Sequence, residues 1–120
     1  MPSLISFSQA IEPVYSHPRE DRRLHGNPQR TTWSHFQSDD GLVDAGVWAC
    51  EVGSWRIAFP AGQEEFFTVL SGRVRLHDEQ GKVSEVGPGE ALLIPAGFTG
   101  VFEVVEPVRK YYVIVQRNLA

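Results

Sequence analysis

The stretch that decides the fold is GSWRIAFPAGQEEFFTVLSG, residues 53–72, followed after a short connection by GEALLIPAGFTGVFEV, residues 89–104. Both contain short apolar segments rich in Phe, Val, Ile and Trp, which favour a pleated and half-buried surface. Glycine and proline punctuate them, because glycine adopts positive φ and proline fixes φ without donating a ladder hydrogen bond. No window of helical length in the chain carries an apolar stripe with a period of about 3.6 residues. The two stretches therefore predict strands joined by tight turns.

The same pattern continues outward on both sides, so we expect a chain of short strands from residue 31 onward. Turn signals separate the expected strands, and Ser71-Gly72 and Glu106-Pro107 are two of them. Many short strands would leave exposed edges unless they closed on themselves. The sequence therefore predicts an all-β fold, a small barrel or jelly roll of two antiparallel sheets. The expected strands cover residues 31–36, 43–52, 55–60, 65–71, 73–77, 82–86, 91–94, 100–105 and 108–117.

Residues 1–30 differ from the rest of the chain in composition and pattern, since they contain four prolines and neither the strand nor the helical period of apolar residues. Such a stretch is typical of an irregular arm lying on a folded body. A length of 120 residues suits one core rather than two. We therefore expect an irregular N-terminal arm at 1–30, a single barrel domain at 31–117 and a C-terminal tail at 118–120.

Charge and composition exclude several classes of protein. The net charge of -4 argues against nucleic-acid binding, which usually leaves a clustered basic footprint. The nearest basic cluster, Arg19, Arg22, Arg23 and Arg30, is diluted by acidic neighbours and is interpreted as a solvated arm. No apolar run is long enough to cross a bilayer, and the first ten residues lack the features of a secretory signal. We expect a cytoplasmic protein with no membrane or nucleic-acid partner.

The spacing of glycine, proline and glutamate resembles that of the cupin superfamily. Gly53, Glu65 and Gly72 occupy the non-histidine anchors of the first cupin motif. Gly89, Pro95 and Gly97 occupy those of the second motif, and the intermotif stretch is short. The segments GVWACEVGSWRI, EEFFTVLSGRVRL and VRKYYVIV further resemble the histidine-poor branch related to ureidoglycine aminohydrolase and to ethanolamine-utilisation cupins. The resemblance covers about residues 31–117 and implies a small cupin barrel, commonly a homodimer, whose activity is open.

The resemblance also implies a metal site whose ligands this chain lacks. Metal-binding cupins hold a divalent ion with three imidazoles and one carboxylate. Here Phe59, Ala61 and Gly100 stand at the histidine positions, so only Glu65 remains. A lone carboxylate binds a first-row metal weakly, because ligand number and type set the affinity. We therefore expect no ordinary cupin metal site. The cofactor stays unknown, and a divalent metal held by other ligands stays open.

Glu65 is the sharpest candidate for a functional group. Period-two alternation puts Glu65 and Phe67 on one face, which the resemblance makes the barrel interior. A carboxylate there requires a partner or a raised pKa. The candidate partners are Lys110 and Tyr112, and a lysine paired with it would be a structural strut or a proton-transfer couple. The three are the expected catalytic residues; the aromatic residues expected around them, as core or as ligand-stacking surface, are Trp48, Trp55, Phe59, Phe67 and Phe102.

Three functions compete at this level. The first is an enzyme or enzyme-like binder that encloses a small polar molecule contacted by Glu65. The second is a non-catalytic cupin that senses a ligand or dimerises. The third is a hydrolase or oxygenase with an unorthodox metal site. A small-molecule ligand and a second copy are the expected partners, with Trp33 and Phe66 facing outward toward a dimer interface.

Overall fold

The computed structural model describes residues 2–117, and strands make up most of them. This confirms the all-β prediction. The elements in chain order are β1 (Val14–Ser16), the short 3-10 helix η1 (Glu20–Arg22), β2 (Arg23–His25), β3 (Arg30–Gln37), β4 (Val43–Cys50), β5 (Gly53–Ala58), β6 (Gln63–Asp78), β7 (Val83–Val86), β8 (Ala91–Ile94) and β9 (Thr99–Gln116).

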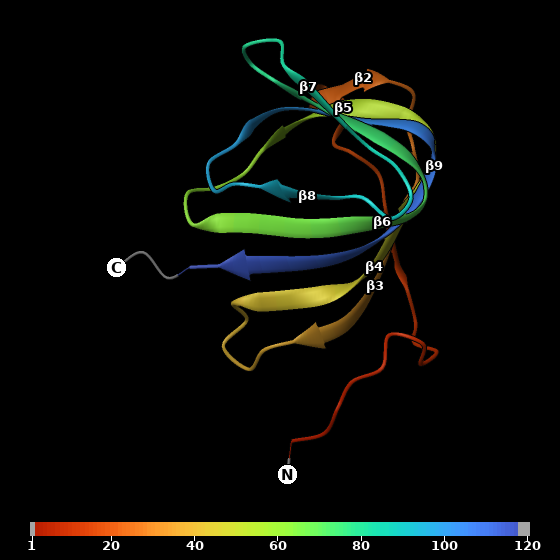
Figure 1. The fold of residues 1–120 in the computed structure, drawn as a ribbon, viewed down its shortest axis with the longest axis vertical. Helices are drawn as coiled ribbons and strands as arrows, with labels where there is room; N and C mark the ends of the chain where they lie inside the picture. Colours follow the sequence, from red (N-terminus) through yellow and green to blue (C-terminus); the bar gives the residue numbers. More distant parts are fainter. Residues whose placement is uncertain (1, 118–120) are drawn as a thin grey trace.

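The strands form one antiparallel sheet that curls into a small barrel (Figure 1). Its order is β1-β3-β4-β9-β5-β2, and β6 pairs with β7, β8 and β9. The long strands β6 and β9 run through both halves of the curl. Residues 99–104 of β9 pair with β5, and residues 108–115 pair with β4. The expected two sheets are thus the two halves of one continuous hydrogen-bonded sheet.

The predicted turns at Ser71-Gly72 and Glu106-Pro107 are wrong, because each lies inside one long strand. The β6–β9 register shifts between Val69 and Val74, which marks a bulge where both strands bend together. Gly72 has φ of 83°, and a Cβ there would lie 2.0 Å from the Pro107 carbonyl oxygen. The glycine therefore permits close backbone contact at the bend, and the chain curves without reversing.

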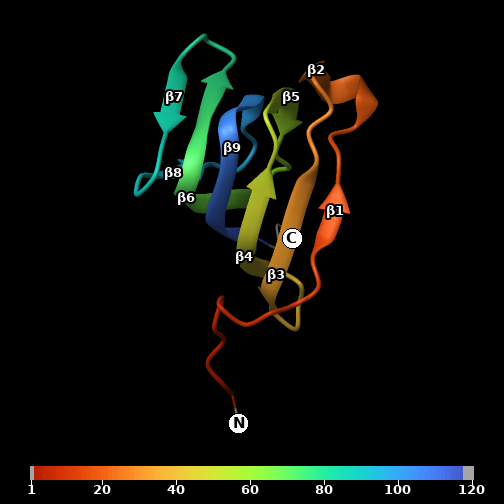
Figure 2. The same ribbon diagram turned by 90° about the vertical axis from the view of Figure 1, so that its right-hand side faces the viewer.

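The expectation of an irregular arm is wrong for part of residues 1–30. β1 pairs with the start of β3, and β2 pairs with β5 (Figure 2). Pro18 and Pro28 are fully buried beside these strands. Further toward the N-terminus, the Phe7 ring stacks on His35 at 4.9 Å and meets Tyr111 edge-on. The arm thus adds strands to the sheet. The expected tail at 118–120 lies outside the described residues.

The concave face of the curl holds the hydrophobic core. Its buried members come mainly from β6 and β9, where alternate side chains point inward on each side of the bend. In the part of the chain that the structure describes, no helix is long and apolar enough to cross a membrane. The cytoplasmic location stays a prediction. The buried core consists of Cys50, Trp55, Phe67, Val69, Val74, Leu76, Val86, Ile94, Phe102, Val104, Val108 and Tyr112.

Candidate functional site

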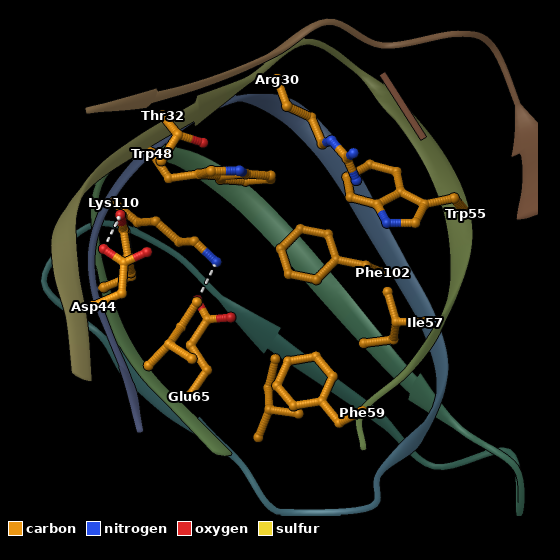
Figure 3. Close-up of a pocket in the computed structure, with 13 residues that line it drawn as sticks. Arg30, Thr32, Asp44, Trp48, Trp55, Ile57, Phe59, Glu65, Phe102 and Lys110 are labelled. Atoms are coloured by element: carbon orange, nitrogen blue, oxygen red, sulfur yellow. Dashed lines mark hydrogen bonds and ion pairs between the residues drawn. The ribbon is translucent and has the colours of Figure 1, made fainter. Parts of the chain in front are cut away.

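The concave face of the sheet leaves a cavity of about 320 Å³, which we call the barrel cavity (Figure 3). Its lining comes from six strands and the residue after β5, so the curl itself creates it. Aromatic and aliphatic side chains predominate, and a few charged groups converge among them, as in small-molecule sites generally. The lining residues are Arg30, Thr32, Asp44, Trp48, Trp55, Ile57, Phe59, Glu65, Ile94, Phe102, Lys110, Tyr112 and Ile114.

A buried ion pair joins the two long strands at this cavity. The Lys110 ammonium donates a hydrogen bond of 2.7 Å to Glu65 Oε2. In the β6–β9 register Lys110 faces Val69, and Glu65 faces Ile114. The lysine side chain therefore runs back along β6, past Phe67, to reach the carboxylate. The sequence proposed this pairing, and the structure brings the two groups together.

Three aromatic rings surround the Lys110 ammonium. Its Nζ lies 4.4 Å from the Trp48 ring centroid, 4.2 Å from that of Phe67 and 5.0 Å from that of Phe102. Ring faces attract a cation, and the attraction is strongest where water is excluded. The cage and the carboxylate together compensate the charge of the ammonium, which belongs to a lysine residue that is only 3% exposed. The lysine is thus held in one place rather than left free to move.

The second oxygen of Glu65 opens to the cavity. Among the described residues, Oε1 has no hydrogen-bond partner, while Oε2 is bound by Lys110. No fully buried side-chain nitrogen or oxygen in residues 2–117 lacks a partner, so Oε1 must retain accessible surface. Figure 3 shows it directed toward the middle of the cavity. The carboxylate is therefore oriented by its buried oxygen and presents the other as an acceptor.

A second polar group lies beside this pair. Ser34 and the Tyr112 hydroxyl both donate to Asp44 Oδ1, at 2.7 Å and 3.1 Å. Burial, and after it the Asp44 charge, raises the pKa of the Tyr112 phenol above its usual range. The phenol therefore stays protonated and acts as a hydrogen-bond donor. It orients Asp44, whose Oδ2 has no partner among the described residues.

Arg30 supplies a positive group on the other side of the cavity. Its guanidinium donates from Nε to Ser16 Oγ at 3.1 Å and from Nη2 to the His17 carbonyl at 3.0 Å. It also lies 5.5 Å from the Trp55 ring centroid. Burial lowers the pKa of the guanidinium below its usual value, which is high enough that the group stays charged. Figure 3 shows Arg30 over Trp55, and Asp44, Lys110 and Glu65 gathered opposite.

The structure places most of the predicted site residues at one cavity. The three expected catalytic residues line it, and so do four of the five expected aromatic residues. Phe67 is the exception, since its side chain is fully buried and contacts Lys110 from beneath. Sequence reasoning missed Arg30, Thr32 and Asp44. Alternation along residues 43–52 could have found Asp44, which shares the face of Trp48.

The donor set does not fit the cupin metal ion. Glu65 Oε2 is bound to Lys110, and the histidine positions carry groups without a lone pair to donate. At Gly100 a Cβ would lie 2.1 Å from the His77 carbonyl oxygen, so the backbone leaves no room for histidine. Nowhere in residues 2–117 do three or more His, Cys, Asp or Glu side chains gather to hold a metal. We derive no chemistry through a metal at this site.

Solved structures share the fold. A protein of unknown function from Pseudomonas syringae pv. tomato DC3000 superposes with a TM-score of 0.78 at 22% identity, over 92% of this chain. This chain spans only 46% of that protein. EutQ from Clostridium difficile gives a TM-score of 0.66 at 20% identity, over 87% of this chain and 82% of its own. A protein named ethanolamine utilization protein Q from Salmonella typhimurium LT2 gives 0.66 at 19% identity, over 92% and 100%. At these identities the likeness shows the fold alone.

The sequence itself carries the family assignment. No curated protein matches the chain. The EutQ-like cupin domain family matches residues 37–112, which include both anchor motifs and all three expected catalytic residues. The resemblance to the ethanolamine-utilisation cupins seen in the sequence is thereby confirmed. The chain belongs to the EutQ-like cupin domain family.

Proposed function

We propose that this protein binds a small polar molecule in the barrel cavity, through a hydrogen bond from the molecule to Glu65 Oε1. The proposal rests on the different surroundings of the two carboxylate oxygens of Glu65. Lys110 holds Oε2 at 2.7 Å, and Oε1 faces the cavity without a partner among the described residues. A preoriented acceptor in an apolar cavity gives a ligand both affinity and orientation.

The same arrangement is suited to proton transfer. Glu65 Oε1 faces the cavity as an acceptor, and Asp44, which accepts the hydrogen bond of the Tyr112 hydroxyl, is a second carboxylate of the cavity lining. Carboxylates that face one cavity are suited to act as general bases on a bound molecule. We infer that any reaction here is a proton transfer or a hydrolysis assisted by these groups.

The test is ligand binding to the protein and to Glu65→Gln, with Glu103→Gln as the matched control. Glu103 accepts a hydrogen bond from His77 outside the cavity, so its replacement changes the charge equally. Small polar molecules are screened by thermal shift, and bound ones are titrated by calorimetry. We expect Glu65→Gln to lose about tenfold or more in affinity, because a charge-assisted hydrogen bond is lost. Unchanged affinity in a folded Glu65→Gln protein would sink the proposal.

The non-catalytic alternative makes a different forecast. A cupin that only dimerises needs no ligand, so no molecule in the screen would bind to the protein or to Glu65→Gln. The cluster of Glu65, Asp44 and Arg30 around an open cavity favours the binding function over this alternative. Buried charged groups cost free energy, and a protein that used them only as filling would be more stable without them.

The expected homodimer stays a proposal, supported by the convex face of the sheet. Leu93, Phe66 and Val113 lie side by side there on β8, β6 and β9, and all are exposed. An exposed apolar patch of this kind marks an interaction surface. A second copy with the same face would cover it symmetrically.

A further inference from the structure

A second cavity, lined by arginines, adjoins the barrel cavity. It has a volume of about 330 Å³, and we call it the arginine groove. The groove is lined by Arg22 from η1 and by Arg19, the residue before η1. Arg30 from β3 and Arg56 from β5 also line it. Because η1 packs against β5, residues that are 26 to 37 positions from Arg56 in sequence come to one place. Of these arm arginines, Arg19 is exposed, as a solvated arm requires, while Arg22 and Arg30 are half-buried.

Most of the positive charge in the arginine groove is uncompensated. Arg19 pairs with Asp21 at 2.7 Å. Within residues 2–117, Arg22, Arg30 and Arg56 have no carboxylate at ion-pair distance. The chain as a whole carries a net charge of -4, so this local excess runs against the overall balance. Guanidinium groups that gather without partners repel one another, and an anion relieves that repulsion.

The two cavities share lining side chains, but one offers hydrogen-bond donors and the other offers acceptors. Arg30, Trp55, Ile57 and Phe59 line both. From this rim, the arginine groove offers donors, while the far wall of the barrel cavity offers the acceptor oxygens of Glu65 and Asp44 (Figure 3). Trp55 and Phe102 stack at 5.2 Å and provide an apolar surface between the two ends.

We propose that the arginine groove is the anion-binding end of the site, and that the ligand is a small organic anion with a hydrogen-bond donor at its other end. Its carboxylate or phosphate group binds Arg22, Arg30 and Arg56. Its apolar middle lies on the aromatic surface, and its donor reaches Glu65. The inference rests on the proposed function, because the donor end needs the barrel cavity.

The experiment uses probes of one shape and different charge. Benzoate, benzamide and benzamidine are nearly isosteric and carry a negative, zero and positive charge; phenyl phosphate separates phosphate from carboxylate binding. Binding is followed by the indole N–H signals in NMR spectra. Trp55 lies at the site, while Trp33 lies under Arg109 on the other face and serves as the internal reference.

We expect benzoate to shift Trp55 but not Trp33, and to bind about tenfold more tightly than benzamide. Arg22→Gln and Arg56→Gln each weaken benzoate and leave benzamide unchanged. Arg75→Gln is the control, because Arg75 is an exposed arginine paired with Glu85 outside the groove. Whichever of benzoate and phenyl phosphate binds more tightly identifies the anionic group, carboxylate or phosphate, that the groove takes. Equal affinities for benzoate and benzamide, or no shift of Trp55 by either anion in the millimolar range, would overturn the inference.

A two-ended probe separates this inference from the proposed function. 4-(Aminomethyl)benzoate carries both the anion and the donor, so it should bind more tightly than benzoate, and Glu65→Gln should remove the advantage. If benzamidine binding depends on Glu65 while both arginine variants leave all anions unaffected, the arginine groove fails and the barrel site stands. If benzoate binding depends on the arginines but the two-ended probe binds no more tightly than benzoate, the groove binds anions but Glu65 does not bind the donor. The proposed hydrogen bond to Glu65 is then wrong, and so is the inference of one two-ended site.

Discussion

Replacing Lys110 with Met tests the physical account of the site most directly. The substitution keeps an unbranched chain of similar length and removes the charge. The lysine side chain is 4% exposed and that of Glu65 is 10% exposed, so the remaining carboxylate would be largely removed from water and would lose the partner of its Oε2. Removing one member of a buried pair costs about 3–5 kcal/mol. A domain of this size has about 5–15 kcal/mol in total, so a large share of its stability would be lost.

The assay is equilibrium unfolding in urea, with thermal unfolding beside it. We expect the melting temperature to fall by roughly 10–20 °C. Arg75→Met is the matched control, because the Arg75–Glu85 pair has the same distance of 2.7 Å but side chains that are 43% and 42% exposed. Its loss should lower the stability much less than Lys110→Met does, because water screens an exposed ion pair.

The double variant Glu65→Leu/Lys110→Met completes the test and remains informative if the single variant does not fold. Replacing a buried pair by apolar groups is often neutral or stabilising. We therefore expect the double variant to regain most of the lost stability while losing ligand binding. A Lys110→Met cost as small as that of the Arg75 control, or a double variant as unstable as the single one, would refute the reasoning.

Three other outcomes follow from the same structure. Burial raises the pKa of Cys50 from 9.0 to about 12, so at mildly alkaline pH iodoacetamide should alkylate it only as fast as the protein unfolds, and rapid alkylation of the folded protein would contradict this. Tyr112→Phe should cost about 1.5–3 kcal/mol, because a partly buried hydrogen bond to the Asp44 carboxylate is lost. Since the pKa of Tyr112 is raised above 10.0, its contribution is complete below that pH and declines above it, and unfolding measured against pH should show a smaller alkaline loss in Tyr112→Phe. Phe66→Asp should give a monomer in size-exclusion chromatography with light scattering, at an unchanged melting temperature, because the ring is 48% exposed on the convex face.

Local pattern was enough to predict the barrel and the centre of its site. Alternation and turn residues are local properties, so the strands could be placed to within a few residues in most cases. The anchor spacing from Gly53 to Gly97 identified the cupin family; alternation placed Glu65 on the face of Phe67, and the resemblance made that face the interior. The sequence alone also shows that Phe59 and Gly100 have no side-chain atom that could ligate a metal.

Long-range pairing decided the rest. Gly72 and Pro107 are compatible with a turn or with a bend inside a strand, and only the facing strand selects the bend. The hydrogen bond from Lys110 to Glu65 depends on the β6–β9 register across 45 residues, which no local pattern specifies.

The same reason separates what the sequence determined about function from what the tertiary structure decided. The sequence determined an inward carboxylate among aromatic residues and a barrel without the cupin histidines. The tertiary structure decided that Lys110 binds one oxygen of Glu65 and leaves the other to the cavity, and that Arg22, Arg30 and Arg56 line one groove. Charge clusters form by chain folding, and charges far apart in sequence interact only when packing brings them within a few ångströms.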